Sequence, residues 1–526
     1  MIITASVAVD VKHPRAKKEY SYLVPESLAS SINVGDVVCV PFNNIKVFGV
    51  VTQRSDLTQN SSDYKLKEII SKEDVSLPSC LMNLSRVLAK YYGTAVIDFL
   101  KLMLPPKVSV KKQTVYCVCS TEKVISNRAI NQKQVYDFII KNGPSTAQNL
   151  SEKLNITFSS AMSALSALTK KGIIKKEYRV IRRKPMVIGC ENNYGHISLT
   201  KQQLNAIKSI THIYCHSKKT TLIYGVTGSG KTEVYIRAIQ SVLRQGKKAL
   251  MLVPEISLTP QMLSIFRQRF PGKTAVIHSR LSSGERYDEW QRINSGSATV
   301  VLGARSAIFA PIQDLGLIII DEEHEGSYKS EITPKYHAVE VAKKRAELTG
   351  AFVILGSATP SLESYQKGLS GEYKLYTLDK RAKEAVLPKV YVVDLREELK
   401  QKNRSIFSRK LKELMEEKLN KNEQIMLFIN RRGYSGFVSC RSCGHVMKCI
   451  HCDVALTSHI HGKLLCHYCG YEEAMPSICP ACGSGYIAAF GTGTQKVEEL
   501  VRREFPGARV LRMDTDTTKG KGGYEE

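Results

Sequence analysis

The 526-residue sequence has no apolar run that approaches the roughly 18 residues needed to cross a bilayer. Its N-terminus, MIITASVAVDVKHPR, lacks the basic segment and the cleavable apolar run of a secretory signal peptide. Short-period repeats and low-complexity tracts are also missing. These absences predict a cytoplasmic protein without a membrane partner, in which paired cysteines are metal ligands rather than disulfides.

Acidic residues are scarce relative to basic ones. The sequence has 49 Asp and Glu against 76 Lys and Arg, for a net charge of +27. The excess is local, because residues 101–190 hold 17 basic and 4 acidic residues, whereas residues 1–100 hold 11 and 10. This distribution favours a polyanionic partner, above all nucleic acid, over the alternative of a merely solvated surface.

The order of strand-like and helical patterns predicts several domains. Residues 1–105 favour a small β-rich domain, with strand-like DVVCVPF and KVFGVVTQ followed by helical LMNLSRVLAKYYG. Residues 132–180 favour three helices and a basic strand-like tail, the pattern of a winged helix that binds DNA or, alternatively, only protein. Beyond these, apolar runs such as TTLIYGV and LGLIIIDEE predict parallel strands with helices on both faces.

The segment GVTGSGKT, residues 225–232, lies between a predicted strand and a predicted helix, as a phosphate-binding loop requires. The glycines let backbone N–H groups surround the phosphates, Lys231 reaches the β- and γ-oxygens, and the Thr232 hydroxyl binds Mg²⁺. Upstream, Gln203 is positioned to contact adenine, although a single glutamine is weak support. The candidate ATP-binding residues are Gln203, Gly225, Gly228, Ser229, Gly230, Lys231 and Thr232.

Two further motifs support ATP hydrolysis. In IIIDEEH an acidic pair ends a predicted buried strand, so that Asp321 would hold Mg²⁺ and Glu322 would orient the attacking water; the alternative is a helix cap or a solvated strand end. The segment GSATPS contains Ser357, Ala358 and Thr359. DEEH and GSATPS together resemble the signature pair of superfamily 2 helicases, and this resemblance implies that the three residues couple the ATP state to movement on nucleic acid.

Eight of the 14 cysteines form four Cys-x-x-Cys pairs: Cys440, Cys443, Cys449, Cys452, Cys466, Cys469, Cys479 and Cys482. Eight thiolates suffice for two tetrahedral Zn²⁺ sites, and an iron–sulfur cluster is the main alternative. The nearby His445, His451 and His467 are interpreted as residues around the ligands rather than as ligands. Strand-like IMLFI precedes this segment and AAFGTGTQKVEELVRREF resumes an α/β pattern, so we expect an insertion stabilised by metal.

The sequence resembles the primosomal protein N′ (PriA) family, the bacterial replication-restart DNA helicases of superfamily 2. Beside the eight cysteines, the resemblance is carried by LVPEISLTPQ (252–261), GARSAIFAP (303–311), DEEHEGSYK (321–329), LFINRRGY (427–434) and RMDTDTT (512–518).

The resemblance implies a multidomain α/β fold with an N-terminal 3′-DNA-binding domain, a winged helix and two RecA-like lobes, the second incomplete and interrupted by a zinc-binding module. The corresponding ranges are 1–105, 106–190, 191–378 for lobe 1, 379–437 and 485–526 for lobe 2, and 438–484 for the insertion. It further implies ATP, Mg²⁺ and two Zn²⁺ as cofactors, with 3′-to-5′ unwinding at stalled or abandoned forks. The implied partners are forked and single-stranded DNA, primosome proteins, the replicative-helicase loader and the single-stranded DNA-binding protein.

The resemblance also implies a crossed pairing of the cysteine knuckles, which spacing alone does not give. One Zn²⁺ would be held by Cys440, Cys443, Cys479 and Cys482, and the other by Cys449, Cys452, Cys466 and Cys469.

Three departures from the family pattern affect these expectations. Ser21 stands where the family has the acid that contacts the 3′-hydroxyl, and Val339-Glu340 replaces an Arg-Asp pair in the coupling loop. The sequence also stops before the family's GRAGR-type arginine motif. An alternative function is therefore a truncated, catalytically deficient form that binds DNA and partners, whereas the zinc insertion and VPEISLT argue against an RNA-directed or chromatin-type translocase.

Elemental analysis of the purified chain is expected to find about two Zn per polypeptide, since eight thiolates form two four-ligand sites. A zinc content near zero, with iron present instead, would contradict the assignment of the knuckles to zinc.

Overall fold

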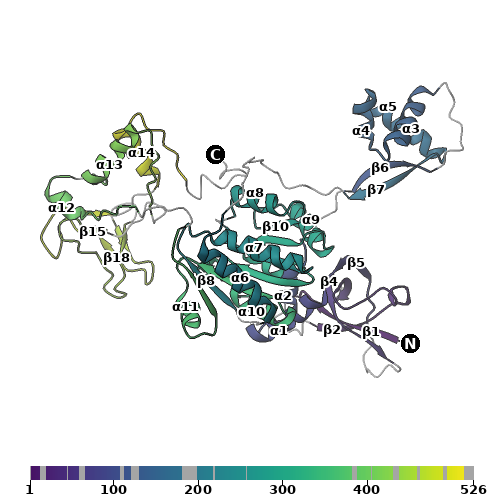
Figure 1. The fold of residues 1–526 in the computed structure, drawn as a ribbon, viewed down its shortest axis with the longest axis horizontal. Coiled ribbons are helices and arrows are strands. Elements are labelled where there is room, and N and C mark those ends of the chain that lie inside the picture. Colours follow the sequence, from purple (N-terminus) through teal and green to yellow (C-terminus); the bar gives the residue numbers. More distant parts are fainter. Residues whose placement is uncertain are drawn as a thin grey trace. The chain divides into compact units, whose positions relative to one another are not determined.

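The computed structural model of the chain forms two compact units, Met1–Ala385 and Val386–Glu526 (Figure 1). The residues that the structure describes are 2–11, 19–43, 45–57, 66–106, 112–119, 129–180, 198–216, 220–255, 258–381, 388–403, 405–429, 438–458, 463–489 and 494–513. None of the helices within these ranges is both long enough and apolar enough to cross a membrane.

The chain begins with a five-stranded antiparallel sheet in the order β2-β1-β4-β3-β5. Its strands are β1 (Ile2–Val9), β2 (Glu19–Leu23), β3 (Asp36–Phe42), β4 (Ile45–Leu57) and β5 (Ser71–Ser76), with a short 3-10 helix, η1 (Glu26–Leu28). Val38, Val40 and Val51 are buried in a cluster on one face, and Val37 and Val50 point into the cluster formed with the helices that follow. Both faces are therefore covered.

Two helices, α1 (Ser79–Tyr92) and α2 (Val96–Met103), follow the sheet. Helix α1 starts after Pro78, whose φ is −64°, and ends at Gly93 in the left-handed conformation. Leu81, Leu84 and Leu88 recur on one face of α1 and are fully buried.

The predicted winged helix is confirmed within the described residues. Helices α3 (Ile130–Asn142), α4 (Ala147–Leu154) and α5 (Phe158–Lys170) pack around a buried cluster that includes Leu150 and Leu165, and β6 (Lys112–Val118) pairs antiparallel with β7 (Ile174–Val180). The Thr146 and Thr157 hydroxyls accept hydrogen bonds from backbone N–H groups at the starts of α4 and α5, which fixes where these helices begin.

A seven-stranded, wholly parallel sheet follows, in the order β10-β11-β9-β12-β13-β8-β14. The strands are β8 (Thr221–Gly225), β9 (Lys248–Leu252), β10 (Thr274–Ile277), β11 (Val300–Gly303), β12 (Leu315–Ile320), β13 (Phe352–Ser357) and β14 (Lys374–Leu378). Every residue of β12 is buried, and its side chains alternate between two apolar clusters, as expected for a sheet that helices cover on both faces.

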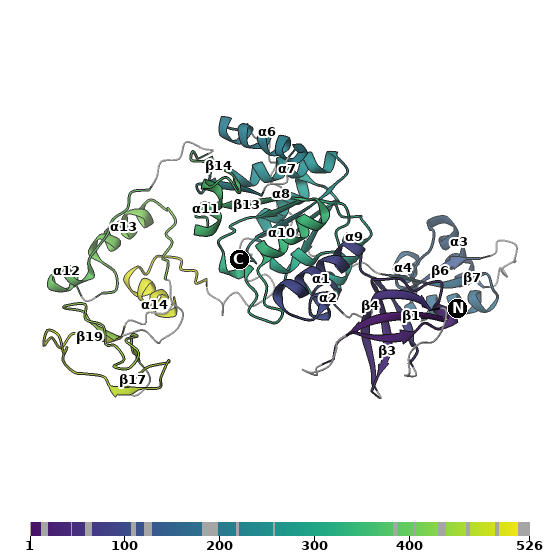
Figure 2. The same ribbon diagram turned by 90° about the horizontal axis from the view of Figure 1, so that it is seen from below.

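The helices divide between the two faces of this sheet (Figure 2). Helices α6 (Lys201–His216), α7 (Lys231–Arg244) and α8 (Pro260–Arg269) lie on one face. The other face is covered by α9 (Ser283–Asn294), α10 (Ala338–Thr349), α11 (Leu362–Leu369) and the 3-10 helix η3 (Arg305–Phe309); η4 (Gly326–Tyr328) follows β12. The parallel α/β architecture predicted for this part is confirmed.

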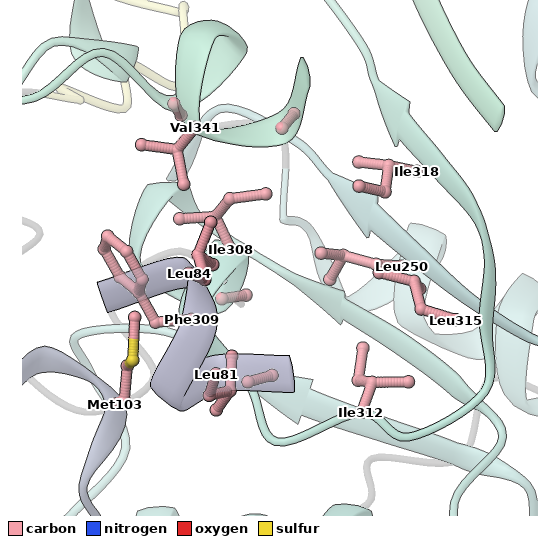
Figure 3. Packing of buried hydrophobic residues seen from close by; sticks show 14 of the residues in the cluster. Leu81, Leu84, Met103, Leu250, Ile308, Phe309, Ile312, Leu315, Ile318 and Val341 are labelled. Carbon is pink, nitrogen blue, oxygen red and sulfur yellow. The ribbon is translucent and has the colours of Figure 1, made fainter. Parts of the chain in front are cut away.

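The N-terminal helices and the parallel sheet share one apolar core. Figure 3 shows Leu81 and Leu84 of α1 beside Ile308, Phe309 and Val341 of the parallel-sheet domain. Two hydrogen bonds join the same parts: the Trp290 indole donates to the Met103 carbonyl at 2.9 Å, and the His337 N–H donates to the Tyr92 hydroxyl at 3.2 Å. The two domains therefore form one packed body.

The described part of the second unit contains three helices and five short strands. They are α12 (Leu395–Lys400), α13 (Arg409–Asn420) and α14 (Thr494–Glu504), and β15 (Val438–Cys440), β16 (Thr457–Ser458), β17 (Lys463–Leu465), β18 (Glu472–Ala474) and β19 (Ile487–Ala489). Phe407, Met415 and Val501 belong to one small cluster, and Leu456 and Leu464 belong to a second one among the knuckles.

The strand predicted at IMLFI is not formed. Residues 423–429 pair with no strand among the described residues, although their side chains alternate as in a strand. Ile425 and Leu427 pack against the helices, whereas Met426 and Phe428 are 91% and 85% exposed. Apolar periodicity alone does not make a strand, because backbone groups also need a hydrogen-bonding neighbour.

Replacing Leu84 with alanine is expected to lower the free energy of unfolding of the first unit by about 2–5 kcal/mol, because a fully buried side chain leaves a cavity in the shared core. Urea denaturation followed by circular dichroism measures the change. Leu102→Ala is the matched control, since Leu102 is 40% exposed in the neighbouring helix. Equal effects of the two substitutions would contradict the shared core.

Candidate functional site

The nucleotide-site candidates meet at one edge of the parallel sheet. Strands β12, β13 and β8 are direct neighbours, and their carboxyl ends carry DEEH, GSATPS and the phosphate-binding loop, respectively. Because parallel strands end at the same edge, segments that lie far apart in the sequence, such as residues 225–232 and 356–361, come together there. Each candidate residue that was singled out in these segments is among the described residues.

The phosphate-binding loop has the backbone shape that its sequence predicts. Gly228 and Gly230 have φ values of +81° and +79°, which L-residues with side chains rarely adopt. Lys231 begins α7, is largely buried, and donates from Nζ to the Gly225 carbonyl at 2.7 Å. The Ser229 hydroxyl is buried without a hydrogen-bond partner in the described structure. A cradle with a free donor and a helix N-terminus fits the phosphates of a nucleotide.

Gln203 lies next to this loop and is only 3% exposed. Its side-chain amide donates to the Ser229 carbonyl at 2.9 Å, and its side-chain oxygen accepts from the Thr200 N–H at 2.8 Å. The glutamine thus ties the start of α6 to the phosphate-binding loop. Its contact with adenine remains a prediction.

Asp321 lies half-buried at the end of β12, where two tyrosines contact it. The Tyr235 hydroxyl donates to its Oδ1 at 2.9 Å, and the Tyr328 hydroxyl donates to its backbone carbonyl at 2.7 Å. Burial raises the pKa of the Asp321 carboxyl, and the Tyr235 hydrogen bond opposes that shift. Glu322, the next residue, has a φ of +47° and is about one-third exposed, so its carboxylate is accessible to solvent. A carboxylate held by a tyrosine hydroxyl beside a second, solvent-accessible carboxylate fits a cation ligand and a residue that orients water.

Glu323 and His324 of DEEH form hydrogen bonds with the segment that ends and follows β13. His324 Nδ1 lies 2.8 Å from the Ser357 hydroxyl, and its Nε2 lies 3.3 Å from the Thr359 hydroxyl. Glu323 is 4% exposed and accepts hydrogen bonds from the Ser361 N–H, the Ser361 hydroxyl and the Ser364 hydroxyl, with the first at 2.7 Å. Movement of either segment would therefore strain the other.

The eight cysteines form two groups of four in the second unit, with all ligand atoms of a group within 4.8 Å of one another. The groups are Cys440, Cys443, Cys479 and Cys482, and Cys449, Cys452, Cys466 and Cys469. They coincide with the crossed pairing that the resemblance implies. In the described residues these groups consist of cysteines alone, and His451 instead packs edge-on against Tyr471 at 5.4 Å between ring centroids.

The sulfur spacing fits a single tetrahedral metal ion. The Sγ atoms are 3.6 Å apart for Cys440 and Cys482, 3.7 Å for Cys443 and Cys479, and 3.5 Å for Cys449 and Cys469. Zinc–sulfur bonds of about 2.3 Å in a tetrahedron place sulfurs roughly 3.8 Å apart. Disulfide sulfurs would lie at about 2.05 Å. The donor set and spacing therefore fit two zinc ions.

All four knuckles repeat one backbone turn. The residue after each second cysteine is left-handed, with φ of +81° at Gly444, +53° at Asp453, +78° at Gly470 and +71° at Gly483. Its N–H donates to the carbonyl of the first cysteine at 2.9 Å in every knuckle. Backbone N–H groups also point at the sulfurs: those of Cys469 and Tyr468 lower the pKa of the Cys466 thiol to about 7. In the same group the hydrogen bond to the Cys469 thiol raises the pKa of the Cys452 thiol to about 12, so the turn lowers the pKa of only some of the thiols.

The described structure also shows contacts that the sequence analysis did not identify. They are the hydrogen bonds of Tyr235, Glu323 and His324 to candidate residues or to the segments beside them. Glu323 and His324 had a signal in the sequence, since they belong to the DEEH motif, whereas Tyr235 had none. The left-handed position after each knuckle had a signal in the sequence, because glycine follows three of the four Cys-x-x-Cys pairs.

Some predicted features are placed without being tested. Ser21 is exposed on the edge strand β2, and Val339 and Glu340 open α10, where Glu340 pairs with Lys343 at 2.7 Å. Residues 430–434 of LFINRRGY and 514–518 of RMDTDTT lie outside the described residues, as do the predicted domain limits at residues 190 and 437.

Three family comparisons match parts of the chain. The family described as 3′DNA-binding domain (3′BD) of PriA matches residues 6–105, winged helix-turn-helix DNA-binding matches residues 128–175, and the res subunit of type III restriction enzymes matches residues 196–362. These ranges correspond to the N-terminal sheet with its helices, the winged helix, and most of the parallel-sheet domain.

Curated relatives match nearly the full chain. Replication restart protein PriA of Bacillus subtilis is 39% identical over 99% of this chain and 74% of its own length, and that of Synechocystis is 36% identical over 99% and 72%. The Haemophilus influenzae protein of the same name is 35% identical over 99% and 71%. Among solved structures, the Pyrococcus furiosus Hef helicase domain aligns at 20% identity and a TM-score of 0.28, over 38% of this chain and 43% of that one, which adds nothing to the assignment. By its identity to relatives over almost its whole length, the chain belongs to the replication restart protein PriA family.

Proposed function

We propose that the chain is an ATP-dependent DNA helicase that moves 3′ to 5′, recognises stalled or abandoned replication forks and initiates primosome assembly for replication restart. Family membership supports the restart helicase role. The observation that carries the proposal is the meeting of Lys231, Asp321 and Ser357 at the carboxyl ends of neighbouring strands. This arrangement suits a site in which phosphate contacts are transmitted to a second segment.

Each residue of the site has a proposed role in hydrolysis. Lys231 exchanges its bond to the Gly225 carbonyl for the β- and γ-phosphate oxygens, while loop N–H groups bind the remaining oxygens. Thr232 and Asp321 would hold Mg²⁺, which neutralises phosphate charge when it is bound. Glu322 orients the attacking water, and Gln203 contacts the adenine.

The proposed coupling runs through His324 and Glu323. Their hydrogen bonds join the residues beside Asp321 to Ser357, Thr359 and the start of α11. A shift of the acidic segment on hydrolysis would therefore move the GSATPS segment. We propose that this link makes Ser357, Ala358 and Thr359 respond to the ATP state.

The proposed partners are forked and single-stranded DNA, primosome proteins, the replicative-helicase loader and the single-stranded DNA-binding protein. The family matches to DNA-binding domains and the net charge of +27 support the DNA partners. Ser21 on β2 stands where the family has the acid that contacts the 3′-hydroxyl, and the two cysteine groups are proposed to hold two Zn²⁺. We propose a cytoplasmic location, in keeping with the proposed role in replication restart.

The domain ranges implied by the resemblance are retained as part of this proposal: 1–105, 106–190, 191–378, 379–437, 438–484 and 485–526. No observation on the described residues favours the alternative of a catalytically deficient form that only binds DNA and partners.

ATP hydrolysis measured with and without forked DNA tests the assignment of the site. We expect Lys231→Ala to abolish DNA-stimulated turnover, because the phosphate contacts of the ammonium group are lost. Lys247→Ala is the matched control, since this exposed lysine follows the opposite end of α7 and should leave turnover unchanged. Undiminished hydrolysis by Lys231→Ala would refute the site.

Binding to DNA should weaken steeply as salt increases, since phosphate contacts release counterions. Replacing both Lys175 and Lys176 of the wing with alanine is expected to reduce the slope of log affinity against log salt by about two. Fluorescence anisotropy with a labelled fork at several salt concentrations measures this slope. Lys247→Ala is the control and should leave the slope unchanged. If the double substitution also leaves the slope unchanged, the wing does not contact DNA.

A further inference from the structure

The hydroxyl of Tyr235 lies at the centre of the nucleotide site, although it belongs to none of the motifs that define that site. Tyr235 is four residues after Lys231 on α7, and its side chain is fully buried. The hydroxyl donates to Asp321 Oδ1 at 2.9 Å. One side chain therefore joins the phosphate-binding helix to the carboxylate at the end of β12.

Gly356, the residue before Ser357 on β13, packs against both partners of this hydrogen bond. A Cβ atom at Gly356 would lie 1.7 Å from the Tyr235 hydroxyl and 3.4 Å from Asp321 Oδ1. Gly356 does not have a positive φ, so the need for glycine here is one of space. The Tyr235 hydroxyl thus occupies the volume that a side chain at position 356 would fill.

A buried hydroxyl in this position constrains the carboxylate. The hydrogen bond fixes the rotation of the Asp321 carboxylate through Oδ1, and the surrounding strands and helix leave the tyrosine ring no room to move. A side chain that already has its binding geometry before the cation arrives binds the cation more tightly, because restricting side-chain rotation on binding costs free energy.

We propose that Tyr235 is the positioning residue for Asp321, holding its carboxylate in the orientation that binds the Mg²⁺ of the Mg²⁺–ATP complex. The inference rests on the proposed ATP site. Tyr235 touches neither nucleotide nor metal and acts only through Asp321. Because Gly356 packs against the same hydroxyl, the helix that follows the phosphate-binding loop, the proposed Mg²⁺ ligand and the strand that carries GSATPS share one contact point.

Nucleotide binding tests the proposal without relying on turnover. The affinity of the full chain for a fluorescent, non-hydrolysable ATP analogue is measured in excess Mg²⁺ and in EDTA. In Tyr235→Phe the ring remains and only the hydrogen bond to a charged group is lost. We expect the tightening of binding by Mg²⁺ to fall roughly three- to tenfold, with the affinity in EDTA unchanged.

Tyr376→Phe is the matched control. Tyr376 lies on β14 of the same sheet, and its buried hydroxyl has no hydrogen-bond partner in the described structure. This variant should bind the analogue as the unmodified chain does under both conditions. Gly356→Ala gives an independent route, since the added Cβ displaces the Tyr235 hydroxyl, and should weaken the Mg²⁺ effect as Tyr235→Phe does.

The outcomes distinguish an error in the proposed ATP site from an error in the proposed role of Tyr235. If the unmodified chain binds the analogue equally well with and without Mg²⁺, the proposed ATP site itself is wrong. If the unmodified chain shows the Mg²⁺ effect and Tyr235→Phe matches Tyr376→Phe, the positioning role of Tyr235 is overturned. An equal loss of affinity in Mg²⁺ and in EDTA would indicate a general packing role and would also overturn it.

Discussion

Burial of both faces of the seven-stranded parallel sheet is the constraint on which the first unit depends. In the described structure one face is covered by α6, α7 and α8, and on the other face the core continues into α1 and α2 of the N-terminal domain. Leu81 and Leu84 would be exposed without the parallel sheet, and Ile308 and Phe309 would lose part of their cover without α1. The proposed DNA-end domain and the proposed ATPase domain are thus parts of one hydrophobic core, which makes independent motion of the two costly.

The second unit depends on a different interaction. Its apolar clusters are small, and the segment between β15 and β19 is organised by four knuckles whose cysteines come together in two groups. Coordination by thiolates can supply the stability that so small a core does not. The same chain therefore uses dispersion and the hydrophobic effect to fix its first unit, and metal ligands to fix the module in its second.

Features set by local sequence could be predicted, and features set by distant partners could not. Buried parallel strands give uninterrupted apolar runs, as in β12, and the phosphate-binding loop and the knuckles are local turns. Tyr235 looks like an ordinary core residue of an amphipathic helix, because its partner Asp321 is 86 positions away. The apolar alternation of IMLFI, residues 425–429, predicted a strand wrongly, because whether a neighbouring strand exists to pair with it is not written in that segment.

The junction of the first two domains carries a built-in optical reporter. Trp290 is the only tryptophan of the 526 residues, is 5% exposed, and donates its indole N–H to the Met103 carbonyl at the end of α2. Indole emission shifts to longer wavelength when the ring is transferred from a buried site to water. The intrinsic fluorescence of the unlabelled chain at tryptophan-selective excitation therefore arises from Trp290. Its emission maximum reports whether the N-terminal helices are packed against the parallel-sheet domain.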